Sequence, residues 1–231
     1  MPNRPNMSEL EVILTGKTER HIHWLTQNVG IHHEMLSAFE QLTLAAKAAG
    51  FELCIASGFR SFDRQLAIWN NKFSGITAIK DKANQTLAIE KLSEREKIHA
   101  IMLFSALPGA SRHHWGCDID VYAKNLLPQD QALALEPWEY QSSGYFYPLS
   151  VWLQEHAKSF GFFLPYDKFR GGVAQEPWHL SSLPLSKEYK KVYSEKLLAE
   201  TLLNTDIQGK NELLHLLPEL YQRYIINTAE A

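Results

Sequence analysis

The chain has 231 residues, which is enough for one compact domain with a hydrophobic core. Apolar residues make up 45%, charged residues 21%, and the net charge is −3, which excludes an electrostatic basis for binding nucleic acid or an anionic membrane. No apolar run is long enough for a membrane span or a signal-peptide core, which predicts a cytoplasmic protein. Cys54 and Cys117 are too few for a disulfide framework, and we expect two reduced thiols.

Helical and extended patterns alternate from the start of the chain. Apolar residues recur at helical spacing over 32–49, and Gly50 is a suitable stop. The run 51–56 follows as a short strand. Ser61 is suited to cap a helix that continues through Trp69, because a serine side chain can accept hydrogen bonds from the first free backbone N–H groups.

A second capped helix leads into a polar strand. Ser93 begins a segment with capping-box spacing and predicts a helix to about Leu107. Residues 117–122 alternate in polarity and predict a strand, with Asp118 and Asp120 on the same face. A buried strand that carries two acids on one face more often lines a polar site than forms plain core.

The remaining elements complete an α+β pattern. A helix and two short strands are predicted at 149–160, 162–165 and 178–181. The tail is charged and helical with repeated leucines, and we expect it to pack over the domain without a chemical role. With no internal repeat or linker, the sequence predicts a single domain over 1–231, with a core at about 30–185 and a helical extension over 186–231.

The most specific chemistry lies in the blocks 111–120 and 176–179. Two imidazoles and one carboxylate form a ligand set for catalytic zinc, which leaves a fourth position for water. The candidate ligands are His113, Asp120 and His179. Glu176 precedes the last ligand by three residues, which suits a general base acting on that water. A lone histidine is usually a surface or core residue, so the prediction of one zinc site depends on the combination.

Several neighbours of these residues are open to more than one interpretation. His114 is the rival of His113, and only one of the two should face the metal if the segment is extended. Asp118 is either a partner that orients a ligand imidazole or a hydrogen-bond acceptor for a nearby turn. Arg112 is expected on the surface, while Trp115 and Trp178 are expected to form walls of the cleft.

Arg60 is the candidate for anion recognition. It lies at the end of a predicted strand between serines and a glycine, in the run Ser57-Gly-Phe-Arg60-Ser61, and is therefore presented to a site. A guanidinium there is suited to bind a terminal carboxylate in bidentate fashion or to stabilise an oxyanion. The alternative is a solvated surface arginine.

Together these blocks resemble the VanY-type D-alanyl-D-alanine carboxypeptidases. These are zinc peptidases related to the D-Ala-D-Ala dipeptidases and to the zinc domain of hedgehog proteins. The matching motifs are Ser111-x-His113-x-x-Gly116-x-x-x-Asp120, Glu176-x-Trp178-His179, and Ser57-Gly-Phe-Arg60-Ser61 followed by Gln65. The resemblance runs from about residue 30 to residue 185.

The resemblance implies a small antiparallel sheet that carries a zinc site and is packed by helices. It implies that His113, Asp120 and His179 bind zinc and that Glu176 is the catalytic base. It also implies that Arg60 contacts the substrate or the developing oxyanion, and the residues expected to line the substrate site are Ser111 and Gln65. The sequence departs from the family pattern at Asp118, where the family usually has a small apolar residue. The precise substrate is therefore left undetermined by the resemblance.

The expected reaction is zinc-dependent hydrolysis of a peptide bond in peptidoglycan peptides or precursors, and the expected substrate is a peptide that ends in D-alanine. One alternative is an endolysin-like endopeptidase that cuts within the stem peptide. A second is a non-catalytic zinc-binding interaction module, against which Glu176 and Arg60 both argue. The absence of a Gly-x-Ser-x-Gly motif agrees with a mechanism that needs no serine nucleophile. The bond that is cut and the oligomeric state are left open.

Overall fold

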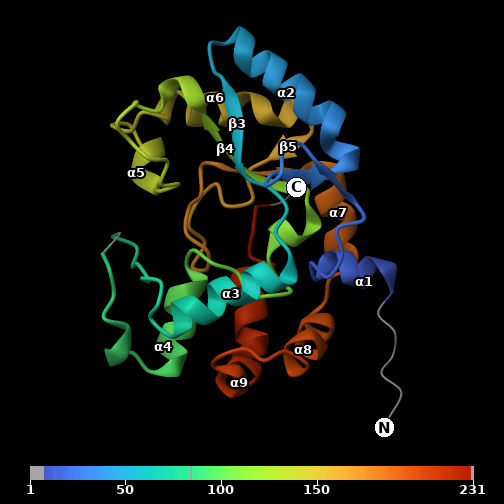
Figure 1. The fold of residues 1–231 in the computed structure, drawn as a ribbon, viewed down its shortest axis with the longest axis vertical. Coiled ribbons are helices and arrows are strands. Elements are labelled where there is room, and N and C mark those ends of the chain that lie inside the picture. The colour runs from blue at the N-terminus through green and yellow to red at the C-terminus, as the bar shows by residue number, and fades with distance from the viewer. Residues whose placement is uncertain (1–7, 84, 230–231) are drawn as a thin grey trace.

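The computed structural model describes residues 8–83 and 85–229, and its centre is an antiparallel sheet (Figure 1). The strands of this sheet lie in the order β3-β4-β6-β5. Their bounds are β3 (Leu53–Ser57), β4 (Asp118–Ala123), β5 (Phe162–Phe163) and β6 (His179–Ser182). The two central strands, β4 and β6, are distant in the sequence, so the sheet brings the two polar blocks of the chain side by side.

Helices cover both ends of the molecule. In Figure 1, α2 and α6 lie beside the sheet at one end, and α3, α4, α8 and α9 gather at the other. The helices are α1 (Glu9–Leu14), α2 (Leu36–Ala48), α3 (Phe62–Phe73), α4 (Glu94–Met102), α5 (Pro137–Tyr140), α6 (Tyr147–His156), α7 (Leu183–Val192), α8 (Glu195–Leu203) and α9 (Lys210–Leu220). The helix α4 packs against both α3 and α9, which joins the C-terminal helices to this end.

The α+β architecture predicted from the sequence is confirmed, as are the helix starts predicted at Ser61 and Ser93. The Ser61 side chain accepts a hydrogen bond from the backbone N–H of Arg64 and caps α3, and Ser93 opens α4 with a capping box. The predicted end of α4 near Leu107 is wrong, because the helix ends at Met102. Leu107 precedes a proline, which disfavours helical backbone there, and the segment instead lines a cleft.

The N-terminal region differs from its prediction. The helix expected from residue 32 begins at Leu36, because His32 belongs to a small hairpin. Its strands are β1 (Ile22–Trp24) and β2 (Gly30–His32). Strands of this length give little periodicity, so the sequence did not reveal them. The hairpin supports the site, since the N–H of His32 donates to the carbonyl of Gly116 over 2.8 Å.

The C-terminal helices are part of the packed interior. Buried leucines from α8 and α9 belong to the same apolar cluster as the sheet residues Ile119, Val121 and Leu180. Burying these side chains contributes stability in proportion to the apolar area removed from water. In the described part of the chain, no helix combines the length and apolar character needed to span a membrane.

Candidate metal centre

Two strands and one short helix bring the three candidate ligands together. Asp120 on β4 pairs directly with His179 on β6, so the two side chains share one face of the sheet. His113 comes from the 3-10 helix Arg112–Trp115 that precedes β4. All three side chains are buried, and their ligand atoms lie within 4.8 Å of one another. His113 Nε2 is 3.3 Å from Asp120 Oδ2, and His179 Nδ1 is 3.3 Å from Asp120 Oδ1.

The orientation of His113 is set by a backbone group. Its Nδ1 lies 3.0 Å from the carbonyl oxygen of Gly58. A carbonyl can only accept, so Nδ1 carries the proton and donates it. In the neutral ring, Nε2 is then a lone pair directed at Asp120. A backbone carbonyl that fixes the tautomer in this way is a common support for a metal-binding histidine.

His179 is oriented by a carboxylate on the neighbouring strand. Its Nε2 lies 3.0 Å from Asp118 Oδ1, which leaves Nδ1 directed at the carboxylates of Asp120 and Glu176. Burial alone would lower the pKa of the His179 imidazole, but the hydrogen bonds to Asp118 and Glu176 and the negative charge of Asp120 raise that pKa well above its ordinary value. The site therefore attracts a positive charge, either as a second proton on the ring or as a metal ion that replaces it.

Asp120 shows that a divalent cation fits between these groups. Its Oδ1 is buried and accepts no hydrogen bond from any residue that the structure describes, although the His179 ring lies beside it. A buried carboxylate oxygen without a donor is costly in free energy. Two imidazole nitrogens and a carboxylate are the donor set that zinc prefers. His113 Nε2, the Asp120 carboxylate and His179 Nδ1 would hold the ion.

Gly116 permits the turn that joins His113 to Asp120. Its φ of +68° is a left-handed conformation that glycine adopts at little cost. A Cβ at this position would lie 2.3 Å from Cδ1 of Ile22 on β1 and 3.2 Å from the backbone N of His32, so the Ile22 side chain would have to move. The short helix can thus end directly ahead of β4, which places both ligands at the same end of the strand.

Glu176 lies at the edge of the same group. Its Oε2 is 3.1 Å from His179 Nδ1, and the N–H of His179 donates to the carbonyl of Glu176 over 3.1 Å. The Glu176 side chain also lines the cleft, whereas Asp118 lies behind the imidazole and away from it. A carboxylate between the ligand cluster and the cleft is placed to exchange a proton with a bound water or substrate.

Arg60 is held in the cleft wall by neutral partners. Its guanidinium donates to Gln65 Oε1 over 3.0 Å and to Ser57 Oγ over 3.1 Å. Gln65 is fully buried and donates to the carbonyl of Ala106. The sequence placed Gln65 in the substrate site, but its side chain lies behind Arg60 and positions it. Burial lowers the pKa of Arg60, while the negative charge of Asp120 raises it.

The cleft is a cavity of about 410 Å³ that joins the ligand cluster to α3 and α4. The residues that line it include Ser111, Trp115 and Trp178. Tyr166 is a wall residue that the sequence did not indicate, since it is a single tyrosine within a loop. Its ring stands edge-on to His179 with the centroids 5.0 Å apart.

His114 and Arg112 have structural partners. The backbone carbonyl of Arg60 accepts from His114 Nδ1 over 2.6 Å, and the N–H of Gly109 donates to His114 Nε2 over 3.0 Å. His114 thus keeps no lone pair for a metal, and burial lowers its pKa to about 3. The expectation that Arg112 is a surface group is wrong. Its guanidinium is buried and donates through Nε to Asp118 Oδ1 over 2.7 Å.

The family description of the VanY D-alanyl-D-alanine carboxypeptidases matches residues 13–185, which is more than half of the chain. The chain belongs to the VanY family. The match includes the blocks 57–61, 111–120 and 176–179, and it begins earlier than residue 30, near which the resemblance was expected to begin.

Curated relatives agree with membership of the VanY family. An uncharacterised protein of Haemophilus influenzae is 38% identical over 122 residues, which are 52% of this chain and 93% of that protein. A D-alanyl-D-alanine carboxypeptidase of Enterococcus faecalis is 28% identical over 165 residues, which are 70% of this chain and 51% of that protein.

Solved structures share the fold. VanYB in complex with D-alanine-D-alanine aligns with a TM-score of 0.50 and 24% identity, over 80% of this chain and 88% of that chain. The LdcB LD-carboxypeptidase aligns with a TM-score of 0.50 and 25% identity, over 87% of this chain and 72% of that chain. A VanY D,D-pentapeptidase in complex with Zn(II) aligns with a TM-score of 0.50 and 24% identity, over 78% of this chain and 92% of that chain.

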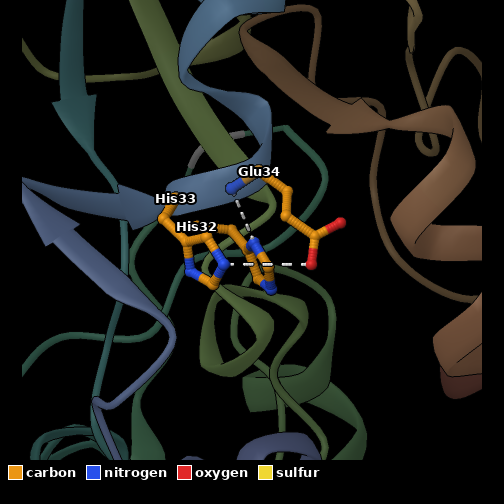
Figure 2. Close-up of side chains that lie close together, drawn as sticks. All are labelled: His32, His33 and Glu34. Carbon is orange, nitrogen blue, oxygen red and sulfur yellow. Dashed lines mark hydrogen bonds and ion pairs between the residues drawn. The ribbon is translucent and has the colours of Figure 1, made fainter.

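A second cluster of possible ligands, His32, His33 and Glu34, lies outside the VanY-type centre (Figure 2). His32 Nδ1 accepts from the backbone N–H of Glu34, so in the neutral ring Nε2 carries a proton, and this atom lies 2.8 Å from Tyr189 Oη. Burial lowers the pKa of His32 to about 4, which keeps the ring neutral near pH 7. His33 and Glu34 are exposed, so this cluster offers a weaker metal site.

Asp118 has a defined place in this member of the VanY family. Its Oδ1 receives hydrogen bonds from Arg112 Nε and from His179 Nε2, while Arg112 also donates to the hydroxyls of Ser181 and Ser186. Burial would raise the pKa of Asp118, but the charge of Arg112 lowers it to about 2. Arg112 therefore holds the Asp118 carboxylate in place, and Asp118 in turn orients the imidazole of the candidate ligand His179.

Asp118→Asn should weaken zinc binding by ~10- to 100-fold, the range for loss of a partner that orients a metal ligand. The amide is uncharged and leaves Arg112 buried without a counter-charge, which should also lower the free energy of unfolding by about 3–5 kcal/mol. The measurements are zinc competition with a chromophoric chelator and urea denaturation.

The double variant Arg112→Met/Asp118→Ala separates the two effects. It removes both buried charges, so stability should largely return, because replacing a whole buried pair costs far less than breaking it. Zinc affinity should remain low, since His179 Nε2 still lacks its acceptor. Wild-type zinc affinity in the double variant would show that Asp118 does not orient the ligand.

Proposed function

We propose that this protein is a zinc-dependent peptidase that acts on peptidoglycan peptides or precursors, as a D-Ala-D-Ala carboxypeptidase. The observation that supports this best is the convergence of the buried His113–Asp120–His179 group, Glu176 and Arg60 on one cleft. Membership of the VanY family agrees with this activity, as do the relative named for it and the similar structure that binds D-alanine-D-alanine.

The residues divide the chemistry between them. His113, Asp120 and His179 would hold a zinc ion, which supplies the Lewis acidity that activates water and polarises a carbonyl. Glu176 takes a proton from the attacking water and passes it to the leaving amine. Arg60 donates to negative charge on the substrate or on the oxygen that develops charge in the transition state. Trp178 and Tyr166 limit the access of other water.

Arg60 provides the test of exo-cleavage. A carboxypeptidase must recognise a free terminal carboxylate, so peptides that end in D-Ala-D-Ala should release D-alanine as free acids and react poorly as C-terminal amides. Arg60→Lys should also lower kcat/KM, roughly 10-fold or more, because lysine cannot form the two parallel hydrogen bonds of a guanidinium. The measurement is mass spectrometry of defined muropeptides and their amidated counterparts, with initial rates for both.

Equal rates on the acid and the amide would reject the carboxypeptidase and favour an endopeptidase that cuts within the stem peptide. Arg60 would then be assigned to the oxyanion alone. Failure to cut any peptide with zinc bound would instead favour a zinc-binding interaction module.

We also propose that the protein acts as one catalytic domain in the cytoplasm, on precursors or recycled fragments. Cell fractionation, with an antibody against the chain to detect it, would test this location.

A further inference from the structure

A second cation lines the cleft beside Arg60. Lys72 lies in the last turn of α3, and its ammonium donates to Ser105 Oγ over 2.6 Å. Ser105 belongs to the segment that follows α4, so the contact spans two walls of the same cavity. The side chain is partly buried, and the helix end contributes a favourable partial charge for a cation.

The Lys72 ammonium is held by a hydroxyl and not by a carboxylate. It forms no ion pair with any residue in the ranges 8–83 and 85–229. The other lysine of the cavity, Lys80, is neutralised by Glu136, whose Oε1 lies 2.5 Å from its Nζ. An ammonium has three donors, and Ser105 uses one of them, so donors remain for a ligand.

Lys72 shares an electrostatic environment with the reacting groups. Burial and the nearby charge of Arg60 lower the pKa of Lys72, while the negative charges of Glu176 and Glu136 raise it. Arg60, by contrast, is influenced first by Asp120 among the charged groups. Arg60 lies beside the ligand cluster, because its backbone N–H donates to the carbonyl of His113 over 3.1 Å, whereas Lys72 lies at the other end of α3. Neither the Glu176 nor the Glu136 carboxylate forms an ion pair with Lys72, so a carboxylate of the substrate can take the donors that Ser105 leaves.

We propose that Lys72, supported by Ser105, is a carboxylate-binding subsite of the cleft that is separate from Arg60. The inference rests on the proposed peptidase function, and it assigns the substrate a second negative group besides the oxygen that develops charge. A peptide offers two sources of this group, its terminal carboxylate and an acidic side chain near the scissile bond. With Lys72 on a carboxylate, Arg60 is available for the oxyanion.

Four peptides separate the sources: acetyl-Glu-D-Ala-D-Ala and acetyl-Gln-D-Ala-D-Ala, each as a free acid and as a C-terminal amide. Free acids compared with amides form the arm that tests the terminal carboxylate, and glutamyl compared with glutaminyl peptides form the arm that tests the acidic side chain. In the wild type, the carboxylate form in one of these two arms should have the lower KM. Lys72→Met should raise KM for that form by roughly 10-fold or more, the scale of a lost charge-assisted hydrogen bond, and should leave the neutral form unchanged. Lys72→Arg should keep most of the preference, and the exposed Lys91→Met should keep all of it.

Binding without turnover keeps the inference separate from the proposed function. Calorimetric dissociation constants for the same peptides would be measured in the Glu176→Gln background, with and without Lys72→Met. If Lys72→Met does not fold, as shown by its thermal midpoint, Ser105→Ala serves instead and should weaken the same arm to a smaller extent. Unchanged preference in both arms overturns the subsite even if the enzyme cuts peptides. A Lys72-dependent preference without any hydrolysis would overturn the proposed function alone.

Discussion

Glu176→Gln should lower kcat by ~10²–10⁴-fold, the usual scale for loss of a general base, while zinc content and fold stay the same. The amide keeps the size of the side chain and its place beside His179, but it cannot accept a proton from water. In the proposed site His113, Asp120 and His179 would hold the metal without Glu176, so its occupancy should not depend on Glu176. The measurement is kcat on a peptide ending in D-Ala-D-Ala, with zinc determined by mass spectrometry on the same sample.

Glu155→Gln on the exposed face of α6 is the matched control and should keep full activity. Two results would contradict the role given to Glu176. Loss of zinc from Glu176→Gln would make this residue a ligand, which its 3.1 Å contact with His179 Nδ1 makes a meaningful alternative. Turnover at the wild-type rate with zinc bound would exclude the proposed proton transfer.

Local signals allowed much of this architecture to be predicted. The Ser93 capping box and the alternation over 117–122 depend on residues adjacent in the sequence, and α4 and β4 begin within a residue of their expected positions. Asp118 and Asp120 share a face because side chains alternate in a strand. The ligand blocks were recognisable because a zinc site needs few residue types at restricted spacing.

Features that depend on distant partners could not be predicted. Arg112 was expected on the surface because its hydrogen-bond acceptors Ser181 and Ser186 are distant in the sequence. They come from β6 and from the first half of α7. Lys72 similarly meets Ser105 only through the packing of α3 on α4. Gln65 was expected to face the substrate, but its hydrogen bond to the carbonyl of Ala106 turns it behind Arg60.

His113→Ala and His179→Ala should each remove the metal from a protein that otherwise binds about one zinc per chain. His113 Nε2 and His179 Nδ1 are the two lone pairs that face Asp120, and no other described imidazole replaces them. His114 in particular has both nitrogens in hydrogen bonds with backbone groups. Zinc per chain after dialysis gives the result directly, and the wild-type thermal midpoint should fall on chelation because metal binding stabilises the folded state.

His33→Ala is the matched control, since it removes an exposed imidazole from the second cluster of possible ligands. That variant should keep its zinc, because His32 beside it already uses both ring nitrogens and leaves too few ligands for a tight site. Full zinc occupancy in His113→Ala, together with loss in His33→Ala, would move the metal to the hairpin strand β2. The peptidase mechanism would then fail, since neither Glu176 nor Arg60 lines that surface.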